Sequence, residues 1–159
     1  MKITVLTAGK IKEKYFTEAV REYAKRLSRY CELQIIETED EATPDNASPA
    51  QETQIKNKEG ARILSRIPAG AYVIALAIQG REVDSVGLSQ KISALTLNGH
   101  SHLVFIIGGS LGLSDAVLEK ADEKLSFSRL TFPHQLMRVI LLEQIYRSFR
   151  IARGEPYHK

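Results

Sequence analysis

The last three residues of the chain carry side chains that together suit work on a nucleic-acid base. Tyr157 offers an aromatic face for stacking, His158 can exchange a proton near neutral pH, and Lys159 supplies a cation. Pro156 stiffens the chain immediately before them. Most chain ends of this kind are simply frayed, so the tail is either a functional segment or a mobile terminus.

Positive charge collects in the same part of the chain. Residues 133–159 hold five Lys or Arg against two acids, whereas residues 1–132 hold 17 basic and 17 acidic residues. The net charge of +3 therefore lies where the chain ends, which suggests an anionic partner there. A solvated basic face explains the charge equally well. The candidate contacts to RNA phosphates, or to a second subunit, are Arg138, Arg147, Arg150, Arg153 and Lys159.

Three short stretches follow expected strands and could bind a small molecule. They are residues 76–80 (LAIQG), 107–112 (IGGSLG) and 127–133 (FSRLTFP). Ligands of open parallel sheets bind beyond the carboxyl ends of the strands, and glycines let backbone groups approach a flat polar ring. Leu76, Leu113 and Leu130 could cover the faces of that ring. Taken alone, the glycine-rich stretch is equally well explained as a tight turn between a strand and a helix.

Several other kinds of site are disfavoured. The glycine-rich stretch is neither the G-x-G-x-x-G fingerprint of dinucleotide binding nor a P-loop. Cys31 is the only cysteine, which excludes an internal disulfide and a cysteine-based zinc site. The four histidines lack zinc-like pairing, and His100-x-His102 more simply marks the edge of a strand. We therefore expect no metal.

Alternating strand and helix patterns set the framework for these residues. Short β-branched or apolar runs predict strands at residues 2–8, 32–38, 71–78, 102–107 and 123–128. Helices are predicted at residues 12–30, 49–66 and 86–97, after Ser114, and from Pro133 onward. Ser48, Pro49 and Gln51 together form a strong helix start. This order predicts an α/β fold with a mainly parallel sheet and helices on both faces, as one domain over residues 1–159.

The final helix is apolar over most of its circumference between Leu136 and Leu142. Such a helix needs cover on two sides. The sheet of its own chain can supply one side, and either the same chain or a second copy can supply the other. Periodicity does not choose between these two arrangements.

Composition places the chain among ordinary globular proteins, with 43% apolar and 26% charged residues. The apolar runs are of strand length and too short to span a membrane. No signal peptide is recognisable at the N-terminus. We therefore expect a cytoplasmic protein without a membrane partner.

The chain closely resembles the RlmH (YbeA-like) family of SPOUT methyltransferases over its entire length. The matching segments are KITVLTAGK, FIIGGSLGL, LSFSRLTFPHQLMRVILLEQIYRSFRI and RGEPYHK. The resemblance implies an α/β fold with a C-terminal trefoil knot, and a homodimer. It also implies transfer of a methyl group from S-adenosylmethionine to N3 of a pseudouridine in 23S ribosomal RNA, on the assembled ribosome.

Position by position, the resemblance assigns roles to the candidate residues. The methyl donor would lie against Leu76, Gly108, Phe127, Ser128, Arg129, Leu130, Thr131 and Phe132. The tail would complete the site of the partner subunit and meet the RNA, with His158 handling the proton of N3 and Tyr157 stacking or hydrogen bonding. Two alternatives remain. One is a non-catalytic ribosome-binding or RNA-binding protein on the same scaffold, and the other is an α/β enzyme that binds a different nucleotide in the glycine-rich stretch.

Overall fold

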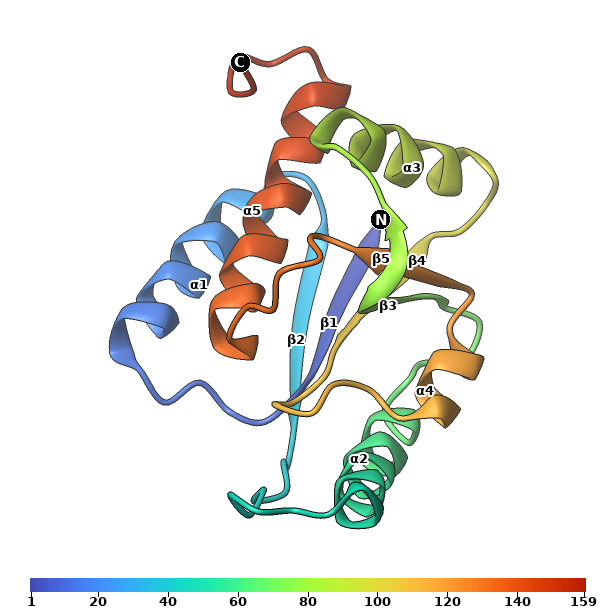
Figure 1. Cartoon of the computed structure of the whole chain (residues 1–159). Coiled ribbons are helices and arrows are strands. Elements are labelled where there is room, and N and C mark those ends of the chain that lie inside the picture. The colour runs from blue at the N-terminus through green and yellow to red at the C-terminus, as the bar shows by residue number, and fades with distance from the viewer.

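The computed structural model describes residues 1–159, in which strands and helices alternate from the first element to the last. Figure 1 shows how these elements are arranged in space, coloured along the chain. They are β1 (Lys2–Ala8), α1 (Lys14–Leu27), β2 (Glu32–Thr38), α2 (Pro49–Leu64), β3 (Tyr72–Glu82), α3 (Ser85–Leu97), β4 (His102–Ile107), α4 (Asp115–Lys120), β5 (Glu123–Ser126) and α5 (His134–Ala152).

All five strands join one parallel sheet in the order β2-β1-β4-β3-β5. The predicted parallel α/β fold is therefore confirmed, and β5 lies at an edge, as its polar sequence indicated. Because the strands are parallel, their carboxyl ends all meet at one edge of the sheet. The segments that follow β4 and β5 come together there, beside residues 76–79 of β3. The trefoil knot stays a prediction.

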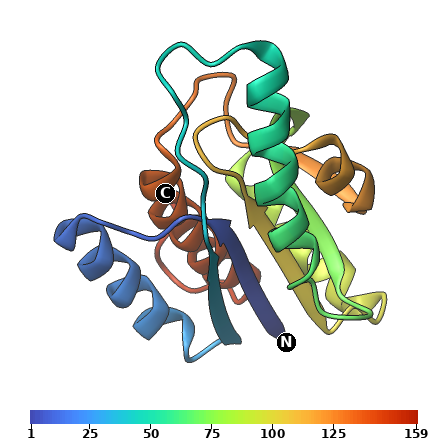
Figure 2. The same ribbon diagram turned by 90° about the horizontal axis from the view of Figure 1, so that it is seen from below.

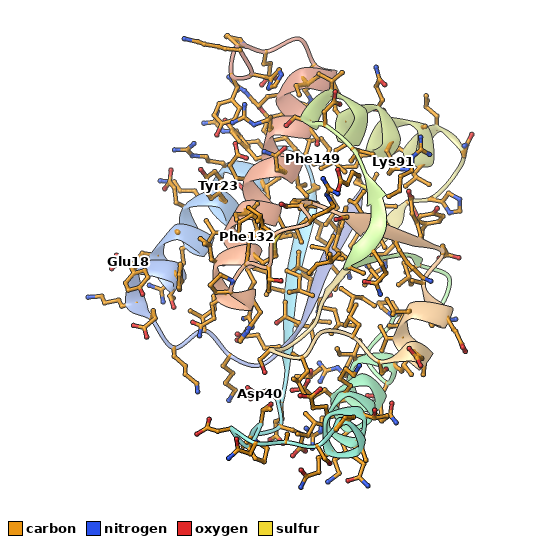
Figure 3. The ribbon with its side chains drawn as sticks, viewed as in Figure 1. Glu18, Tyr23, Asp40, Lys91, Phe132 and Phe149 are labelled. Carbon is orange, nitrogen blue, oxygen red and sulfur yellow. The ribbon has the colours of Figure 1, made fainter.

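Helices cover both faces of the sheet, as predicted. One apolar core joins the sheet to α1, α3 and α5, and it includes Val5, Phe105 and Leu141. The other core joins the opposite face to α2 and α4, through Ile63 and Val117. The strands β1 and β4 alternate side chains between the two cores, which explains why β4 is apolar without interruption. Figure 2 shows the sheet between the two helix layers, and Figure 3 shows the side chains that fill them.

Local sequence signals at the helix ends are confirmed. The side chain of Ser48 accepts a hydrogen bond from the Gln51 amide at 3.2 Å, and the Gln51 side chain accepts one from the Ser48 amide at 2.8 Å. Gly99 ends α3 with a φ of +92°, in the left-handed region that favours glycine. Ser114 caps α4 through the Val117 amide. No helix is both long and apolar enough to cross a membrane.

Several element boundaries differ from the prediction, including the end of α2 at Leu64 rather than residue 66 and the start of α3 at Ser85 rather than residue 86. The helix α1 spans residues 14–27 rather than 12–30. The strand β3 does not turn away after Ile78 but continues to Glu82, and its pairing with β5 shifts register between Leu76 and Arg81. Gly80 permits this close passage, because a Cβ there would lie 2.7 Å from the backbone of β5. The strand β5 accordingly ends at Ser126, before the predicted residue 128.

The final helix is fully covered on one side only. Leu141, Leu142 and Ile145 are completely buried against the sheet and the neighbouring helices. Three further apolar residues keep partial exposure, namely Leu136, Val139 and Ile140. A single chain therefore leaves part of this apolar helix uncovered, and the homodimer stays a prediction.

Candidate functional site

A cavity of about 680 Å³ opens beside residues 76–79 of β3 and the carboxyl ends of β4 and β5. We call it the strand-end cavity. Its walls come from the three stretches singled out in the sequence, together with Lys56 on α2 and Met137 on α5. Seven of the eight residues expected to bind a ligand line it, namely Leu76, Gly108, Phe127, Ser128, Leu130, Thr131 and Phe132. Arg129 does not line the cavity, and its side chain is 89% exposed beside Glu82.

The glycine loop (residues 108–112) folds back on itself to form one wall. The Gly112 amide donates to the Gly109 carbonyl at 3.1 Å. A Cβ on Gly108 would lie 2.7 Å from the backbone of Gly112, so this turn admits no side chain at position 108. Gly112 has a φ of +88°, which glycine adopts without strain. The glycines therefore shape the cavity wall as well as connecting β4 to α4.

The segment after β5 forms the opposite wall through its own hydrogen bonds. The Ser128 side chain accepts from the Leu130 amide at 3.0 Å, and the Ser126 hydroxyl donates to the Ser128 carbonyl at 3.1 Å. This tight turn carries Leu130, which is 70% exposed, while Ile78 from β3 is 48% exposed. Both apolar side chains line the cavity, where a flat apolar ligand would cover them.

Few charges line the strand-end cavity. Lys56 and His134 are its only ionisable lining residues. Burial lowers the pKa of His134, and the nearby Arg138 guanidinium lowers it further. His134 is therefore neutral at physiological pH. The cavity suits a ligand with a flat apolar ring whose polar edges meet backbone groups.

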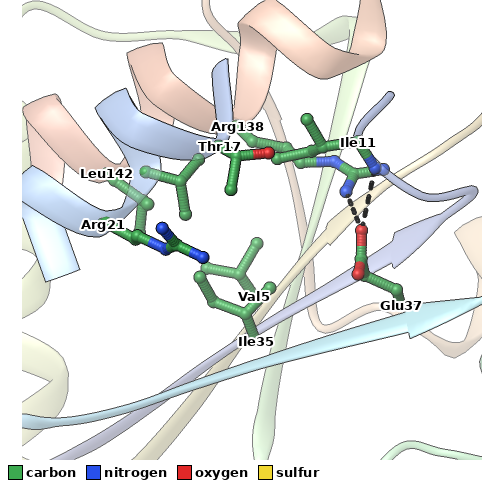
Figure 4. A pocket seen from close by; sticks show the side chains of 9 residues that line it. Val5, Ile11, Thr17, Arg21, Ile35, Glu37, Arg138 and Leu142 are labelled. Atoms are coloured by element: carbon green, nitrogen blue, oxygen red, sulfur yellow. Dashed lines mark hydrogen bonds and ion pairs between the residues drawn. The ribbon is translucent and has the colours of Figure 1, made fainter. Parts of the chain in front are cut away.

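Arg138 does not contact solvent, contrary to the expectation that it binds an RNA phosphate. Its side chain is 2% exposed. The guanidinium pairs with Glu37 at 2.6 Å and donates to the carbonyl of Gly9 at 2.7 Å and of Ala8 at 3.3 Å. Figure 4 shows this pair beside a smaller cavity of about 310 Å³ between α1, α5 and the sheet. Arg138 thus ties α5 to the ends of β1 and β2, and we exclude it from the RNA surface.

The chain end is docked rather than frayed. The Tyr157 hydroxyl donates to Glu143 at 3.0 Å, and its ring packs edge-on against Tyr146 at 4.9 Å between centroids. Burial and the Glu143 hydrogen bond raise the pKa of Tyr157 to about 12. Tyr157 is therefore a neutral hydrogen-bond donor at physiological pH and a poor candidate for a base.

Two of the candidate RNA-binding arginines are engaged by neighbouring acids. Arg147 pairs with Glu143 at 2.6 Å, and its guanidinium lies 4.7 Å from the Tyr157 ring centroid. Arg150 pairs with Glu155 at 2.7 Å and donates to the Pro156 carbonyl at 3.0 Å. Both arginines hold the tail in place. Arg153 and Lys159 are exposed, although Arg153 lies over the Tyr30 ring.

Within one chain, the tail and the strand-end cavity do not meet. His134 and Met137 line the cavity at the start of α5, whereas Tyr157 and His158 follow its end. A helix of 19 residues is about 28 Å long, and Figure 1 shows the C-terminus at the far end of α5. The two groups of candidate residues therefore belong to opposite ends of the subunit.

Sequence reasoning missed three residues that the structure brings into these regions. Glu143 is the common partner of Arg147 and Tyr157, and its position four residues before Arg147 is a usable signal. Lys56 gave no local signal. Glu59 is buried beside the glycine loop, and nothing in the sequence indicated its burial, because its neighbours one turn away on α2, Lys56 and Arg62, are charged.

Comparison with known proteins adds a family, relatives and a fold neighbour. Residues 1–158 match a family model described as "Predicted SPOUT methyltransferase". A protein of Bifidobacterium adolescentis named ribosomal RNA large subunit methyltransferase H is 60% identical, and one of Clostridium tetani with the same name is 58% identical. Each alignment covers all of both chains. The structure of a probable methylase family protein from Haemophilus influenzae superimposes with a TM-score of 0.52 at 11% identity, covering 99% of this chain and 70% of that one, which supports the fold alone.

Proposed function

Because the chain belongs to the SPOUT methyltransferase family, we propose that it transfers a methyl group from S-adenosylmethionine to ribosomal RNA of the large subunit. The observation that carries this proposal is the full-length identity of 57–60% with relatives named for that activity. We further propose that the acceptor atom is N3 of a pseudouridine in 23S RNA of the assembled ribosome, in the cytoplasm.

The strand-end cavity fits the methyl donor in size and chemistry. A cavity of about 680 Å³ is in the usual range for cofactor sites. Leu76, Phe127 and Leu130 offer apolar faces for an adenine ring, and the tightly folded backbone of the glycine loop offers N–H and C=O groups to its edges. A neutral His134 adds no positive charge that would repel the sulfonium of the donor.

The bound donor supplies an electrophilic methyl group on its sulfonium sulfur. The chain's own residues must then hold the acceptor base in line with that methyl group and accept the N3 proton. Positioning of reactants contributes about 7–11 kcal/mol at best, and a base contributes about 10²–10⁴-fold in rate. The docked tail offers Tyr157 to hold the base and His158 to accept the proton.

The hydrogen bond of His158 limits how it can act. Arg147 Nη1 lies 3.2 Å from His158 Nδ1, and arginine only donates. His158 Nδ1 therefore accepts, and the neutral ring carries its proton on Nε2. We propose that His158 takes up the N3 proton at Nδ1, after RNA binding draws Arg147 away.

The separation of tail and cavity supports a site built from two subunits. We propose that a second copy covers the partly exposed Leu136, Val139 and Ile140 on α5. We propose that, in this dimer, the tail of one subunit lies at the strand-end cavity of its partner. Arg153 and Lys159 are then proposed to contact RNA phosphates. Replacing either residue by Ala should weaken RNA binding. It should also reduce the slope of the logarithm of the binding constant against the logarithm of the salt concentration by about one unit.

The function is tested by transfer of a labelled methyl group to ribosomes that lack the modification. Labelling of 23S RNA at one pseudouridine, with none on isolated RNA, is the expected result. Binding of ribosomes and donor without transfer would contradict the proposal and favour a non-catalytic ribosome-binding protein. Competition by another nucleotide for the cavity would favour the second alternative. The role of His158 is wrong if His158→Ala keeps the single-turnover rate and its pH profile.

A further inference from the structure

Glu59 is a buried carboxylate that the proposed chemistry does not use. It lies on the inner side of α2 and is 4% exposed. Burying a charge is costly unless specific partners compensate for it. Burial accordingly raises the pKa of Glu59 above that of an ordinary glutamate. Because burying this carboxylate costs free energy, we expect Glu59 to have a role other than filling space in the core.

The carboxylate of Glu59 lies directly against the glycine loop. A Cβ built on Gly109 would be 2.9 Å from Oε1 and 3.1 Å from Oε2 of Glu59. Only glycine lets the loop approach the acid this closely. Gly109 also lines the strand-end cavity, so Glu59 supports the cavity wall from the side away from the ligand.

The next residue of α2 fixes the other end of the same connection. A Cβ on Gly60 would overlap the Ser114 hydroxyl and lie 3.0 Å from the Ser114 Cβ. Ser114 is the residue that caps α4. Two consecutive residues of α2 therefore hold both ends of the stretch that runs from Gly109 to Ser114.

Glu59, which lies against the glycine loop, is also hydrogen bonded to a third segment, the acidic loop (residues 39–47). Its Oε2 accepts a hydrogen bond from the Glu41 amide at 3.0 Å. The Thr43 and Ser110 hydroxyls lie 3.4 Å apart, which adds a second link between the two loops. Arg62 pairs with Glu41 at 2.5 Å and donates to the Glu39 carbonyl at 3.1 Å.

We propose that Glu59 is a positioning residue for the methyl donor, which acts through Gly109 by holding the glycine loop and by placing negative charge behind it. The inference rests on the proposed function, because it assumes that the cavity binds S-adenosylmethionine. The donor's sulfonium is a cation, whereas the sulfur of the product S-adenosylhomocysteine is neutral. Ionised Glu59 therefore favours the donor over the product.

The charged groups around Glu59 set how its charge responds to pH. Burial raises the pKa of Glu59 most, and the hydrogen bond from the Glu41 amide lowers it. The Asp40 carboxylate raises this pKa, Arg62 on the same helix lowers it, and the Glu41 carboxylate raises it. His134 and Lys56 also line the cavity and contribute their own pH dependence. The effect of Glu59 on donor binding is therefore measured by comparing how the donor affinity depends on pH in the unaltered protein and in Glu59→Gln.

Calorimetric titration with S-adenosylmethionine and S-adenosylhomocysteine between pH 5 and 7 tests the proposal. We expect Glu59→Gln to bind the donor roughly tenfold more weakly at pH 7, the change that accompanies one unit of coupled pKa shift. The affinity of the unaltered protein for S-adenosylmethionine should decrease as the pH is lowered from 7 to 5. The affinity of Glu59→Gln should change less over the same range. Product binding should change little. Glu119→Gln removes an equal charge from the exposed side of α4 and should behave as the unaltered protein.

Thermal unfolding separates positioning from general support of the fold. The folded-state pKa of Glu59 is raised, so its contribution to stability is present at low pH and is lost as pH rises through that value. Glu59→Gln should therefore be no less stable than the unaltered protein at pH 7. Equal donor affinity and pH profile in Glu59→Gln would overturn the proposal, and so would a parallel loss of stability and binding.

Hydrogen exchange of the glycine-loop amides gives a readout that needs no ligand. If Glu59 holds the loop, these amides should exchange faster in Glu59→Gln and Glu59→Ala than in the unaltered protein. Unchanged exchange would overturn the proposal even if the donor does not bind. Failure of the unaltered protein to bind the donor would count against the proposed function instead.

Discussion

Arg138 Nη1 and Glu37 Oε2 lie 2.6 Å apart, although 101 positions separate the two residues in the chain. The pair joins α5 to β2, and two further hydrogen bonds from Arg138 reach the carbonyls after β1. One side chain thus fixes the start of α5 against two strand ends, directly beside residues that line the strand-end cavity.

Removal of this guanidinium should destabilise the fold. We expect Arg138→Ala to lower the free energy of unfolding by about 3 kcal/mol. This is the low end of the cost of breaking a buried ion pair, because the Glu37 side chain is 35% exposed and can be hydrated once Arg138 is removed. Urea denaturation at fixed protein concentration measures the change. Arg138→Lys, which keeps the charge but cannot reach three acceptors, should fall in between. Full stability in Arg138→Ala would contradict the structural role.

The tight turn of the glycine loop predicts that Gly108→Ala impairs donor binding. The added methyl group would lie 2.7 Å from the Gly112 backbone, so the loop must shift. A cost of about 1–3 kcal/mol for such overpacking corresponds to roughly 5- to 150-fold weaker binding. Calorimetric titration with S-adenosylmethionine measures it. Gly70→Ala is the matched control, because its Cβ meets nothing within 4 Å. It should lose some stability at its positive φ but keep donor affinity.

A site shared between subunits should be restored by mixing two inactive variants. At donor concentrations well below the Kd of Gly108→Ala, that variant leaves its cavity largely empty, and deletion of residues 157–159 removes the tail. If the tail serves the partner's cavity, a heterodimer of these variants has one intact site. Random assortment makes half of the dimers heterodimers, so methyl transfer should recover to about a quarter of that of the unaltered protein. Absence of recovery in verified heterodimers would mean that each cavity uses its own tail.

The raised pKa of Tyr157 predicts a stability difference at high pH. Its folded-state value of about 12 lies above the ordinary value of 10.0, so its stabilising contribution is complete below pH 10 and is lost as pH approaches 12. The difference in unfolding free energy between the unaltered protein and Tyr157→Phe should be constant from pH 7 to 9 and shrink above pH 10. A constant difference throughout would show that Glu143 does not hold the neutral phenol.

Burial makes the only cysteine unreactive. Desolvation raises the pKa of the Cys31 thiol from 9.0 to about 11. The thiolate fraction at pH 8 therefore falls about a hundredfold below that of an exposed thiol. Alkylation by iodoacetamide should be slower by a similar factor than alkylation of glutathione, and it should reach the normal rate in urea. Rapid labelling of the folded protein would contradict this placement.

Local sequence signals predicted much of the fold because they act over a few residues. The bounds of β1, β2 and β4 and the capping box of Ser48 follow from short apolar runs and cap chemistry. The extension of β3 beyond Ile78 was missed, since it depends on β5 passing close to Gly80. Pairing between strands distant in sequence cannot be read from either strand alone.

The candidate site was predicted unevenly for a similar reason. The three stretches around the strand-end cavity follow from a general rule about parallel strands, whereas the eight donor-binding residues were implied by the family resemblance, and seven of the eight line the cavity. The environments of the arginines were less predictable, because the sequence alone does not distinguish an arginine exposed to solvent from one that pairs with an acidic residue. The partner of Arg138 is far away in the chain, whereas Glu143 and Glu155 lie within one or two turns of Arg147 and Arg150.

The hydrogen bond from Arg138 to the Gly9 carbonyl spans 129 positions, which has a consequence for synthesis. The end of β1 emerges from the ribosome early, yet the Gly9 carbonyl receives its partner only after 129 further residues have been made. At about 5–20 residues per second, the wait is roughly 6–26 s. During that time the N-terminal strands remain open at their carboxyl ends. Nascent chains that pause before residue 138 are therefore the ones we expect chaperones to hold.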